Sequence, residues 1–269
     1  MDVTRLSPSG LGLLQMCGLA FKYKYLDKRP TLSGTAAAVG TAVHKSAEED
    51  LNNKLSFSNL LPDDQIGDVA ADAFENAWES REMMLQPEEK SDLSGTKATC
   101  KDQSISLAHL HHDDLAPTID PLHLEQKLEV EFEGFPLKLL GYADVIEADG
   151  VLRDLKTRAR KPHANDAAND LGLAWYAMAI EASGLHEVVP KMALDVLTKT
   201  KTPKLHTVYT GPAPGHTPIL RRIEAASRVI ATGSYMPAAP GHWKCSEKFC
   251  EFWADCPFGK PDRRVINHV

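Results

Sequence analysis

Residues 122–157 alternate between apolar and polar side chains, and this alternation constrains the fold more than any other feature of the chain. An apolar residue at every second position is typical of a strand with one buried face. Gly134 and the pair Asp149-Gly150 interrupt the pattern as turn signals. The stretch LHLEQKLEVEFEGFPLKLLGYADVIEADGVLRDLKT therefore predicts an antiparallel meander of three strands.

The second of these turns decides which side chains face each other. A two-residue turn places Asp144 opposite Leu155, whereas a three-residue loop over 148–150 places it opposite Asp154. We favour the three-residue loop, which is a common hairpin form with glycine in the left-handed conformation. Asp154 and Lys156 point to the same side of their strand, because residues two apart share a face.

Two facing carboxylates repel each other unless a proton or a cation lies between them. Mg²⁺ and Mn²⁺ favour such oxygen ligands, retain several waters and can bind a phosphate oxygen. Lys156 could position or deprotonate an attacking water and stabilise charge at phosphorus. The alternative is structural, a simple ion pair of Asp144 with Lys156 or Arg153. The residues alone leave both interpretations open.

Helical and strand patterns surround the meander and indicate an α/β fold. Helices are expected within 4–29, from about residue 36 onward, and over 62–84, 165–183 and 214–232, with two more strands in VPKMALDVLTK and KLHTVYT. Residues 86–103 are polar and turn-rich, which predicts a mobile surface segment, and a short helix follows over 109–114. We expect one domain over 1–269, with 86–118 as a flexible insert.

Charge and hydropathy limit the classes of function. The formal charge of −7 argues against a chain coated with nucleic acid, but a local basic run at Arg158, Arg160 and Lys161 leaves room for a groove. No stretch of eighteen apolar residues occurs, and the N-terminus lacks the pattern of a signal peptide. We therefore expect a cytoplasmic protein without a membrane partner.

Three of the five cysteines form a tight run in WKCSEKFCEFWADCPFG, at Cys245, Cys250 and Cys256. Thiols this close in a reducing compartment favour a metal centre over inert core residues. Spacing allows a zinc ion held by four cysteines, or by three cysteines and His242, and equally allows an iron-sulfur cluster. A fourth thiol could come from Cys17 or Cys100.

The segment GYADVI, followed by DLK ten residues after Asp144, resembles the PD-(D/E)xK nuclease superfamily, in particular its RecB-type exonuclease branch. GTAVH at 40–44 is similar to that branch's upstream helix motif, and NDLGLAWYAMA to its Gln-x-x-x-Tyr helix, although Gly172 replaces the glutamine. The resemblance implies a restriction-endonuclease-like fold, with a central mixed sheet flanked by helices.

The resemblance also implies an activity, which is divalent-metal-dependent DNA exonuclease action on single strands or DNA ends, in recombination, repair or phage DNA metabolism. The implied catalytic residues are Asp144, Asp154 and Lys156. The implied ligands of Mg²⁺ or Mn²⁺ are His44, Asp144, Asp154 and the Leu155 carbonyl, and the implied DNA-supporting residues are Tyr176, Arg158 and Arg160.

One early cysteine in LLQMCGLAFKYKY and a C-terminal triplet resemble the iron-sulfur RecB-type nucleases, including CRISPR-associated and phage-encoded forms. This implies a structural [4Fe-4S] cluster, with zinc as the lesser alternative, in a subdomain made of 1–30 and 235–260. Its ligands would be Cys17, Cys245, Cys250 and Cys256. DNA is the implied partner, and a recombination, helicase or CRISPR-type protein partner stays unidentified.

Two rivals remain at this stage. A DNA-binding iron-sulfur adaptor that has lost turnover is kept open by Gly172, because that position lacks the family's polar side chain. A zinc-stapled protein without a nucleic-acid role is kept open by the cysteine spacing.

Overall fold

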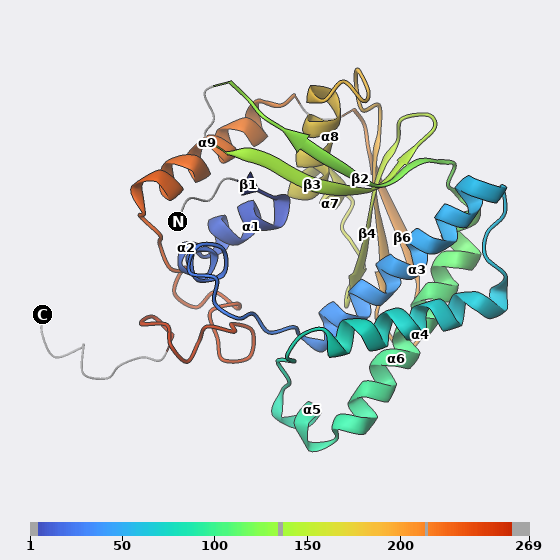
Figure 1. Ribbon diagram of the computed structural model, residues 1–269, viewed down its shortest axis with the longest axis horizontal. Coiled ribbons are helices and arrows are strands. Elements are labelled where there is room, and N and C mark those ends of the chain that lie inside the picture. Colours follow the sequence, from blue (N-terminus) through green and yellow to red (C-terminus); the bar gives the residue numbers. More distant parts are fainter. Residues whose placement is uncertain (1–4, 134–136, 213–214, 260–269) are drawn as a thin grey trace, which may run out of the picture.

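The computed structural model describes residues 5–133, 137–212 and 215–259. Its centre is a mixed sheet in the order β1-β3-β4-β5-β6, with β2 paired to the opposite edge of β3 (Figure 1). The strands are β1 (Arg5–Leu6), β2 (Pro121–Val130), β3 (Lys138–Glu147), β4 (Leu152–Arg158), β5 (Met192–Thr198) and β6 (Leu205–Thr210).

The predicted meander is confirmed, because β2, β3 and β4 pair in antiparallel order. The two later strands are also confirmed: β5 runs parallel to β4, and β6 antiparallel to β5. The two-residue strand β1 pairs in parallel with the start of β3 and was not predicted, since a strand this short carries no period. The sheet is therefore mixed, as the resemblance implied.

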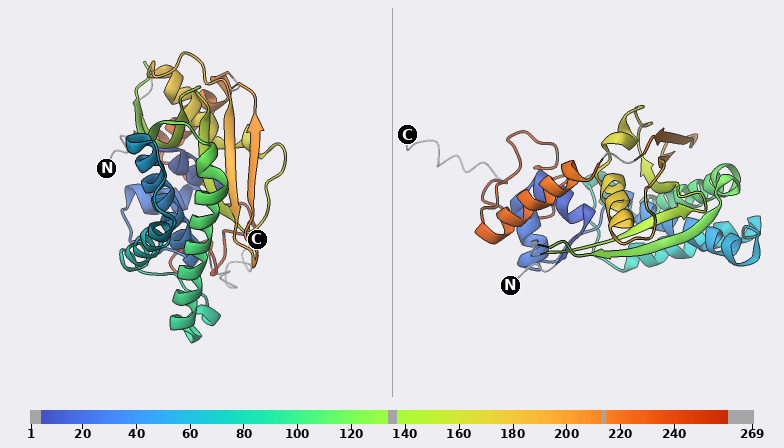
Figure 2. Two further views of the ribbon diagram at one scale, coloured as in Figure 1. Left: turned by 90° about the vertical axis from the view of Figure 1, so that its right-hand side faces the viewer. Right: turned by 90° about the horizontal axis from the view of Figure 1, so that it is seen from above.

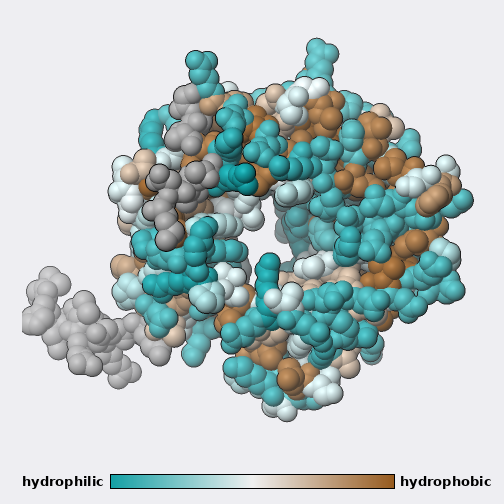
Figure 3. Space-filling model, viewed as in Figure 1, coloured by the Kyte–Doolittle hydropathy of each residue, from teal (hydrophilic) through white to brown (hydrophobic). Residues whose placement is uncertain are grey.

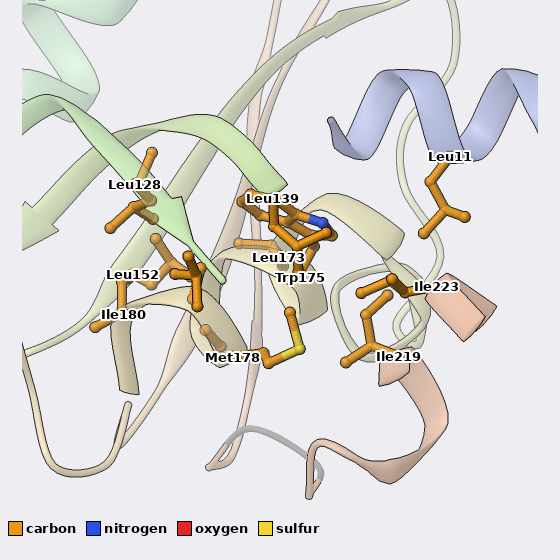
Figure 4. Packing of buried hydrophobic residues seen from close by; sticks show 14 of the residues in the cluster. Leu11, Leu128, Leu139, Leu152, Leu173, Trp175, Met178, Ile180, Ile219 and Ile223 are labelled. Carbon is orange, nitrogen blue, oxygen red and sulfur yellow. The ribbon is translucent and has the colours of Figure 1, made fainter. Parts of the chain in front are cut away.

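One face of the sheet packs against α1 (Pro8–Met16), α8 (Leu171–Ala182) and α9 (Thr217–Thr232), with the short α7 (Asp166–Asn169) before α8. Trp175 and Met178 of α8 are fully buried between the strands and α9 (Figure 4). Ile219 and Ile223 form a stripe on α9, because residues four apart lie on one side of a helix. This layer fixes the position of α8 beside β4.

The other face is covered by α3 (Thr35–Phe57), α4 (Asp63–Glu79) and α6 (Leu93–Leu110), which form a separate helical layer (Figure 2). Helix α3 buries Ala38 and Ala42, whose small side chains let it approach the sheet closely. Gly40, on the same helix, lies near β4: a Cβ there would be 3.4 Å from the Thr157 hydroxyl. The layer therefore brings the middle of α3 to the sheet.

The prediction of a turn-rich segment over 86–103 is wrong, because most of these residues are helical. Residues 87–91 form α5 (Pro87–Ser91), and most of the remainder belongs to α6. Asp92 caps α6 by accepting a hydrogen bond from the Gly95 amide, and Leu107 is fully buried against the layer. Tertiary packing of a few apolar residues thus overrides a polar composition. The chain continues through η2 (His111–Leu115) and η3 (Ala116–Thr118).

The N-terminal helices and the segment 235–259 pack together at the lower left of Figure 1. Helices α2 (Gly18–Phe21) and η1 (Lys22–Leu26) contact the segment 235–259, where the rings of Tyr23 and Phe252 lie 5.4 Å apart. The Leu19 amide donates to the Met236 carbonyl at 3.3 Å, and Gly18 permits this approach because a Cβ would lie 3.0 Å from that backbone. Within the described ranges, no helix combines the length and the apolar character that a membrane crossing requires.

Candidate active site

The β3–β4 hairpin sets the geometry of the site. Its loop has three residues, with Gly150 at φ 85°, and Val145 pairs with Arg153 and Ile146 with Leu152. This register places Asp144 opposite Asp154, as predicted. The regular pairing ends there, and the Asp144 Oδ2 atom instead accepts a hydrogen bond from the Leu155 amide at 2.8 Å.

Three side chains from three elements converge at this point. One ligand atom from each of His44 on α3, Glu125 on β2 and Asp144 on β3 lies within 4.8 Å of the other two. His44 Nδ1 is 3.6 Å from Asp144 Oδ2. Burial lowers the pKa of His44, so the ring is neutral near pH 7 and offers a lone pair. These donors are of the kind that bind a divalent cation.

Glu125 was missed in the sequence, although it belongs to this group. It lies opposite Asp144, between the pairs Leu124–Val145 and Gln126–Ala143, and adopts a left-handed φ of 43°. Burial, with the nearby Asp144 carboxylate, raises the pKa of Glu125 to about 7. Nothing local separates Glu125 from the other glutamates of this strand, because its role depends on the β2–β3 register.

Asp154 and Lys156 share one face of β4, as predicted, and Lys156 Nζ lies 2.7 Å from Asp154 Oδ1. Asp154 is only 2% exposed, and its Oδ2 atom has no hydrogen-bond partner among the described residues. Burial raises the pKa of Asp154 to about 7. A buried carboxylate oxygen without a partner is costly, and a cation or a proton would satisfy it.

Asp154 does not belong to the group formed by His44, Glu125 and Asp144, so the predicted ligand set is only partly brought together. Burial acts to lower the pKa of Lys156, but Asp154 and Asp144 outweigh it and raise that pKa above its ordinary value. The side chain is therefore a cation that faces the carboxylates. The alternative pairing of Asp144 with Lys156 or Arg153 is not the one observed, since Arg153 pairs with Glu147 and Asp195.

Space adjoins the three-ligand group on two sides. An open groove of about 440 Å³ exposes His44, Glu125 and Lys156 to solvent. A second, narrower pocket behind the group is lined by His44, Glu125 and Asp144 and also by His111, whose Nδ1 has no hydrogen-bond partner among the described residues. Burial lowers the pKa of His111 to about 3, so that ring is neutral. The groove is the side from which a substrate could reach His44, Glu125 and Lys156, whereas Asp144 lines the other pocket.

Helix α8 contributes the next part of the site. A Cβ on Gly172 would lie 4.0 Å from Asp154 Oδ1 and 3.7 Å from the Tyr176 ring. The position that holds glutamine in the resembled family therefore lies beside Asp154. Burial raises the pKa of Tyr176 above its ordinary value, and the carboxylates of Asp144 and Asp154 raise it further. Its phenol is protonated at neutral pH and can donate a hydrogen bond.

The two arginines predicted to contact DNA differ in their surroundings. Arg158 is held by Asp166 at 3.0 Å and lies 3.8 Å from Asp170, so acidic partners already compensate its charge. Arg160 is exposed just beyond the end of β4. Arg160 is therefore the better placed of the two for a phosphate contact.

The predicted cysteines gather where the chain's ends meet. Cys17, Cys245, Cys250 and Cys256 line one largely apolar pocket together with Leu19, Tyr23 and Phe252. Cys100 lies elsewhere, against α3 and α4.

One protein family and two solved structures are similar to this chain. Residues 5–257 match the family described as the PD-(D/E)XK nuclease superfamily. A protein from Eubacterium rectale, named "putative exonuclease", has a crystal structure similar to this chain, with a TM-score of 0.55 and 15% identity over 90% of this chain and 86% of that one. At such low identity the likeness concerns the fold alone.

A second solved structure, that of SSO0001, aligns at 14% identity over 91% of this chain and 94% of that chain. Its TM-score of 0.32 is too low to support an argument. No curated protein is significantly similar to this chain.

Proposed function

The chain belongs to the PD-(D/E)XK nuclease superfamily, and we propose that it is a divalent-metal-dependent DNA exonuclease, acting in recombination, repair or phage DNA metabolism. The observation that carries the proposal is the buried Asp154, whose Oδ2 has no hydrogen-bond partner among the described residues and whose Oδ1 contacts Lys156. A carboxylate in this state, beside the group of His44, Glu125 and Asp144, fits a site built to take a cation.

Mg²⁺ or Mn²⁺ would be held by Asp144, Asp154 and His44, with Glu125 added from the structure and the Leu155 carbonyl as a further donor. When bound, such an ion polarises a phosphodiester and lowers the pKa of a bound water. The catalytic residues of the proposal are Asp144, Asp154 and Lys156.

The protein's own side chains supply orientation and charge. Lys156, held by Asp154, presents a cation that can hold the attacking water and stabilise negative charge developing on the phosphate. The protonated phenol of Tyr176 can donate to a phosphate oxygen. Arg160 extends positive charge along the path that leaves β4, and Arg158 lies beside it with its charge partly compensated by Asp166 and Asp170.

The shape of the molecule favours a single strand or a free DNA end as substrate. Figure 3 shows an opening that passes through the molecule, and in the matching view of Figure 1 it is framed by α1 and α2, β4, and the layer of α3, α4 and α6. The open groove gives access to His44, Glu125 and Lys156. A strand threaded through an opening must enter by its end, which agrees with exonuclease action.

We propose further that Cys17, Cys245, Cys250 and Cys256 hold a [4Fe-4S] cluster, which joins 1–30 to 235–260. Support comes from the pocket that the four cysteines line together, since such clusters are commonly held by four cysteine thiolates. Anaerobically purified protein should be brown and contain about four iron atoms per chain. Cys17→Ser should lose this iron, and Cys100→Ser should keep it. Zinc without iron in wild-type protein would contradict the assignment.

A second candidate is a DNA-binding adaptor without turnover, and the position of Gly172 beside Asp154 favours it. No side chain at residue 172 can contact Asp154, Lys156 or substrate there. In this case the protein binds DNA and retains its cluster, but does not cleave.

The test is cleavage of end-labelled single-stranded and double-stranded DNA by anaerobically purified protein with Mg²⁺ or Mn²⁺. Lys156→Ala should lower the rate by on the order of a hundredfold or more, whereas Lys201→Ala, which removes an exposed lysine between β5 and β6, should cleave like wild type. Metal-independent cleavage, or an unaffected Lys156→Ala variant, would overturn the proposal. DNA binding without cleavage by wild type, with activity gained by Gly172→Gln, would establish the adaptor.

A further inference from the structure

A second group of metal-ligating side chains lies away from the active site, where α4 begins and α6 passes into η2. It consists of Asp63, His112 and Asp113, and one ligand atom from each lies within 4.8 Å of the other two. Asp63 is the first residue of α4, whereas His112 and Asp113 belong to η2. We propose that this group binds a transition-metal cation of the Zn²⁺ class.

The first support is a buried carboxylate behind the histidine. Asp50 of α3 is 0% exposed, and its Oδ1 atom accepts a hydrogen bond from the Leu61 amide at 2.8 Å. Its Oδ2 atom lies 2.9 Å from Nδ1 of His112. A carboxylate on one ring nitrogen fixes the tautomer and orientation of a histidine and leaves the other nitrogen for a metal. The ring of His112 is therefore held with Nε2 as its available ligand atom.

The second support is the charge around the ring. Asp63 and Asp113 are both exposed, so no core contact forces their carboxylates toward His112. Like charges this close repel, and a cation between them removes the cost. His109 adds another imidazole at the edge of the group, with Nδ1 at 3.3 Å from Asp63 Oδ1. Imidazole together with carboxylate is the donor set that suits Zn²⁺ rather than Mg²⁺.

The competing explanation is a proton. A protonated His112 would donate to Asp50 from Nδ1 and to the exposed aspartates from Nε2, and no metal would be needed. Zn²⁺ uptake separates the two explanations, because only the metal site loses an equivalent of bound zinc when the imidazole is removed.

The position of this group gives a bound cation a structural consequence. It would join the start of α4 to η2, two segments that are distant in the sequence. Element η2 also carries His111, which lines the pocket behind His44, Glu125 and Asp144. A cation at His112 would therefore stiffen the wall of that pocket without contacting the proposed catalytic residues.

The experiment is a Zn²⁺ titration of the full chain, dialysed to remove loosely bound metal, by calorimetry with elemental analysis of bound zinc. His112→Gln should bind one equivalent of zinc fewer than wild type. Asp113→Asn, a change at an exposed position, should bind that equivalent at least about tenfold more weakly, and Asp50→Asn about 10–100-fold more weakly. Mg²⁺ should not distinguish these variants.

His163→Gln is the matched control, because it removes an exposed histidine outside the group and should bind zinc like wild type. The proposal is overturned if His112→Gln and Asp113→Asn take up as much zinc as wild type, with unchanged affinity. The readout is metal binding and not DNA cleavage, so the result does not depend on whether the protein is a nuclease.

Discussion

Replacing Gly141 by alanine should destabilise the protein, although the change adds one methyl group to a strand. Gly141 lies on β3, and a Cβ there would be 2.9 Å from Cζ3 of Trp175 and 2.9 Å from Cε1 of Tyr176. Carbon atoms in good contact lie about 3.5–4.0 Å apart. Both rings belong to α8, and Trp175 is completely buried, so its ring cannot move away freely, whereas the half-buried ring of Tyr176 can be displaced.

The expected size follows from two opposing effects. Extra volume in a packed core costs about 1–3 kcal/mol, and replacing glycine in a strand returns about 0.5–1 kcal/mol through the unfolded chain. The free energy of unfolding should therefore fall by about 1 kcal/mol at the midpoints of these ranges, and by about 2.5 kcal/mol at most, with a drop of a few degrees in Tm. The rate of DNA cleavage should fall by more than any loss of folded protein explains, because the added methyl group displaces the ring of Tyr176, which lies at the active site.

Urea unfolding followed by circular dichroism measures the change, with Gly12→Ala as the control. Gly12 lies inside α1, where a Cβ would meet only Leu171 at an ordinary 3.8 Å. Alanine there should raise the free energy of unfolding by about 0.5–1 kcal/mol. If Gly141→Ala proves as stable as wild type while Gly12→Ala behaves as expected, the inferred clash with the two rings is refuted.

Three further changes should alter the free energy of unfolding, each measured by the same urea titration. Arg153→Met leaves the buried carboxylates of Glu147 and Asp195 without their cation and should lower the free energy of unfolding by about 3–5 kcal/mol. A decrease below about 1 kcal/mol would mean that Arg153 does not neutralise both carboxylates. Leu107→Ala should cost about 2–5 kcal/mol because the side chain is fully buried, and a negligible loss would show that α6 does not belong to the core. Asp92→Ala should cost about 1 kcal/mol through loss of the α6 cap, which an unchanged unfolding midpoint would contradict.

The β3–β4 hairpin around Gly150 could be predicted from residues that lie close together in the sequence. The alternation over 122–157, and a glycine suited to positive φ, were enough to predict the loop and the opposition of Asp144 and Asp154. The shared face of Asp154 and Lys156 followed from the strand period alone. These features depend on residues close together in the chain, which is why a pattern in the sequence predicts them.

Features that depend on distant pairing were not accessible in this way. Glu125 enters the site only because β2 pairs with β3 in one register, and its neighbours in the sequence give no sign of that pairing. Helix α6 was missed because its composition is polar, and contacts of Leu107 with other helices stabilise it.

The sequence by itself determined the strands, the acidic pair with its lysine, and the cysteines that the two ends contribute. His44 was implied by the family resemblance, whereas only the tertiary structure decided which further groups join them: Glu125 at Asp144, and Asp63 and Asp50 at His112. The physical reason is that periodicity and turn chemistry act over a few residues, whereas burial and convergence of charge arise when separate elements pack together.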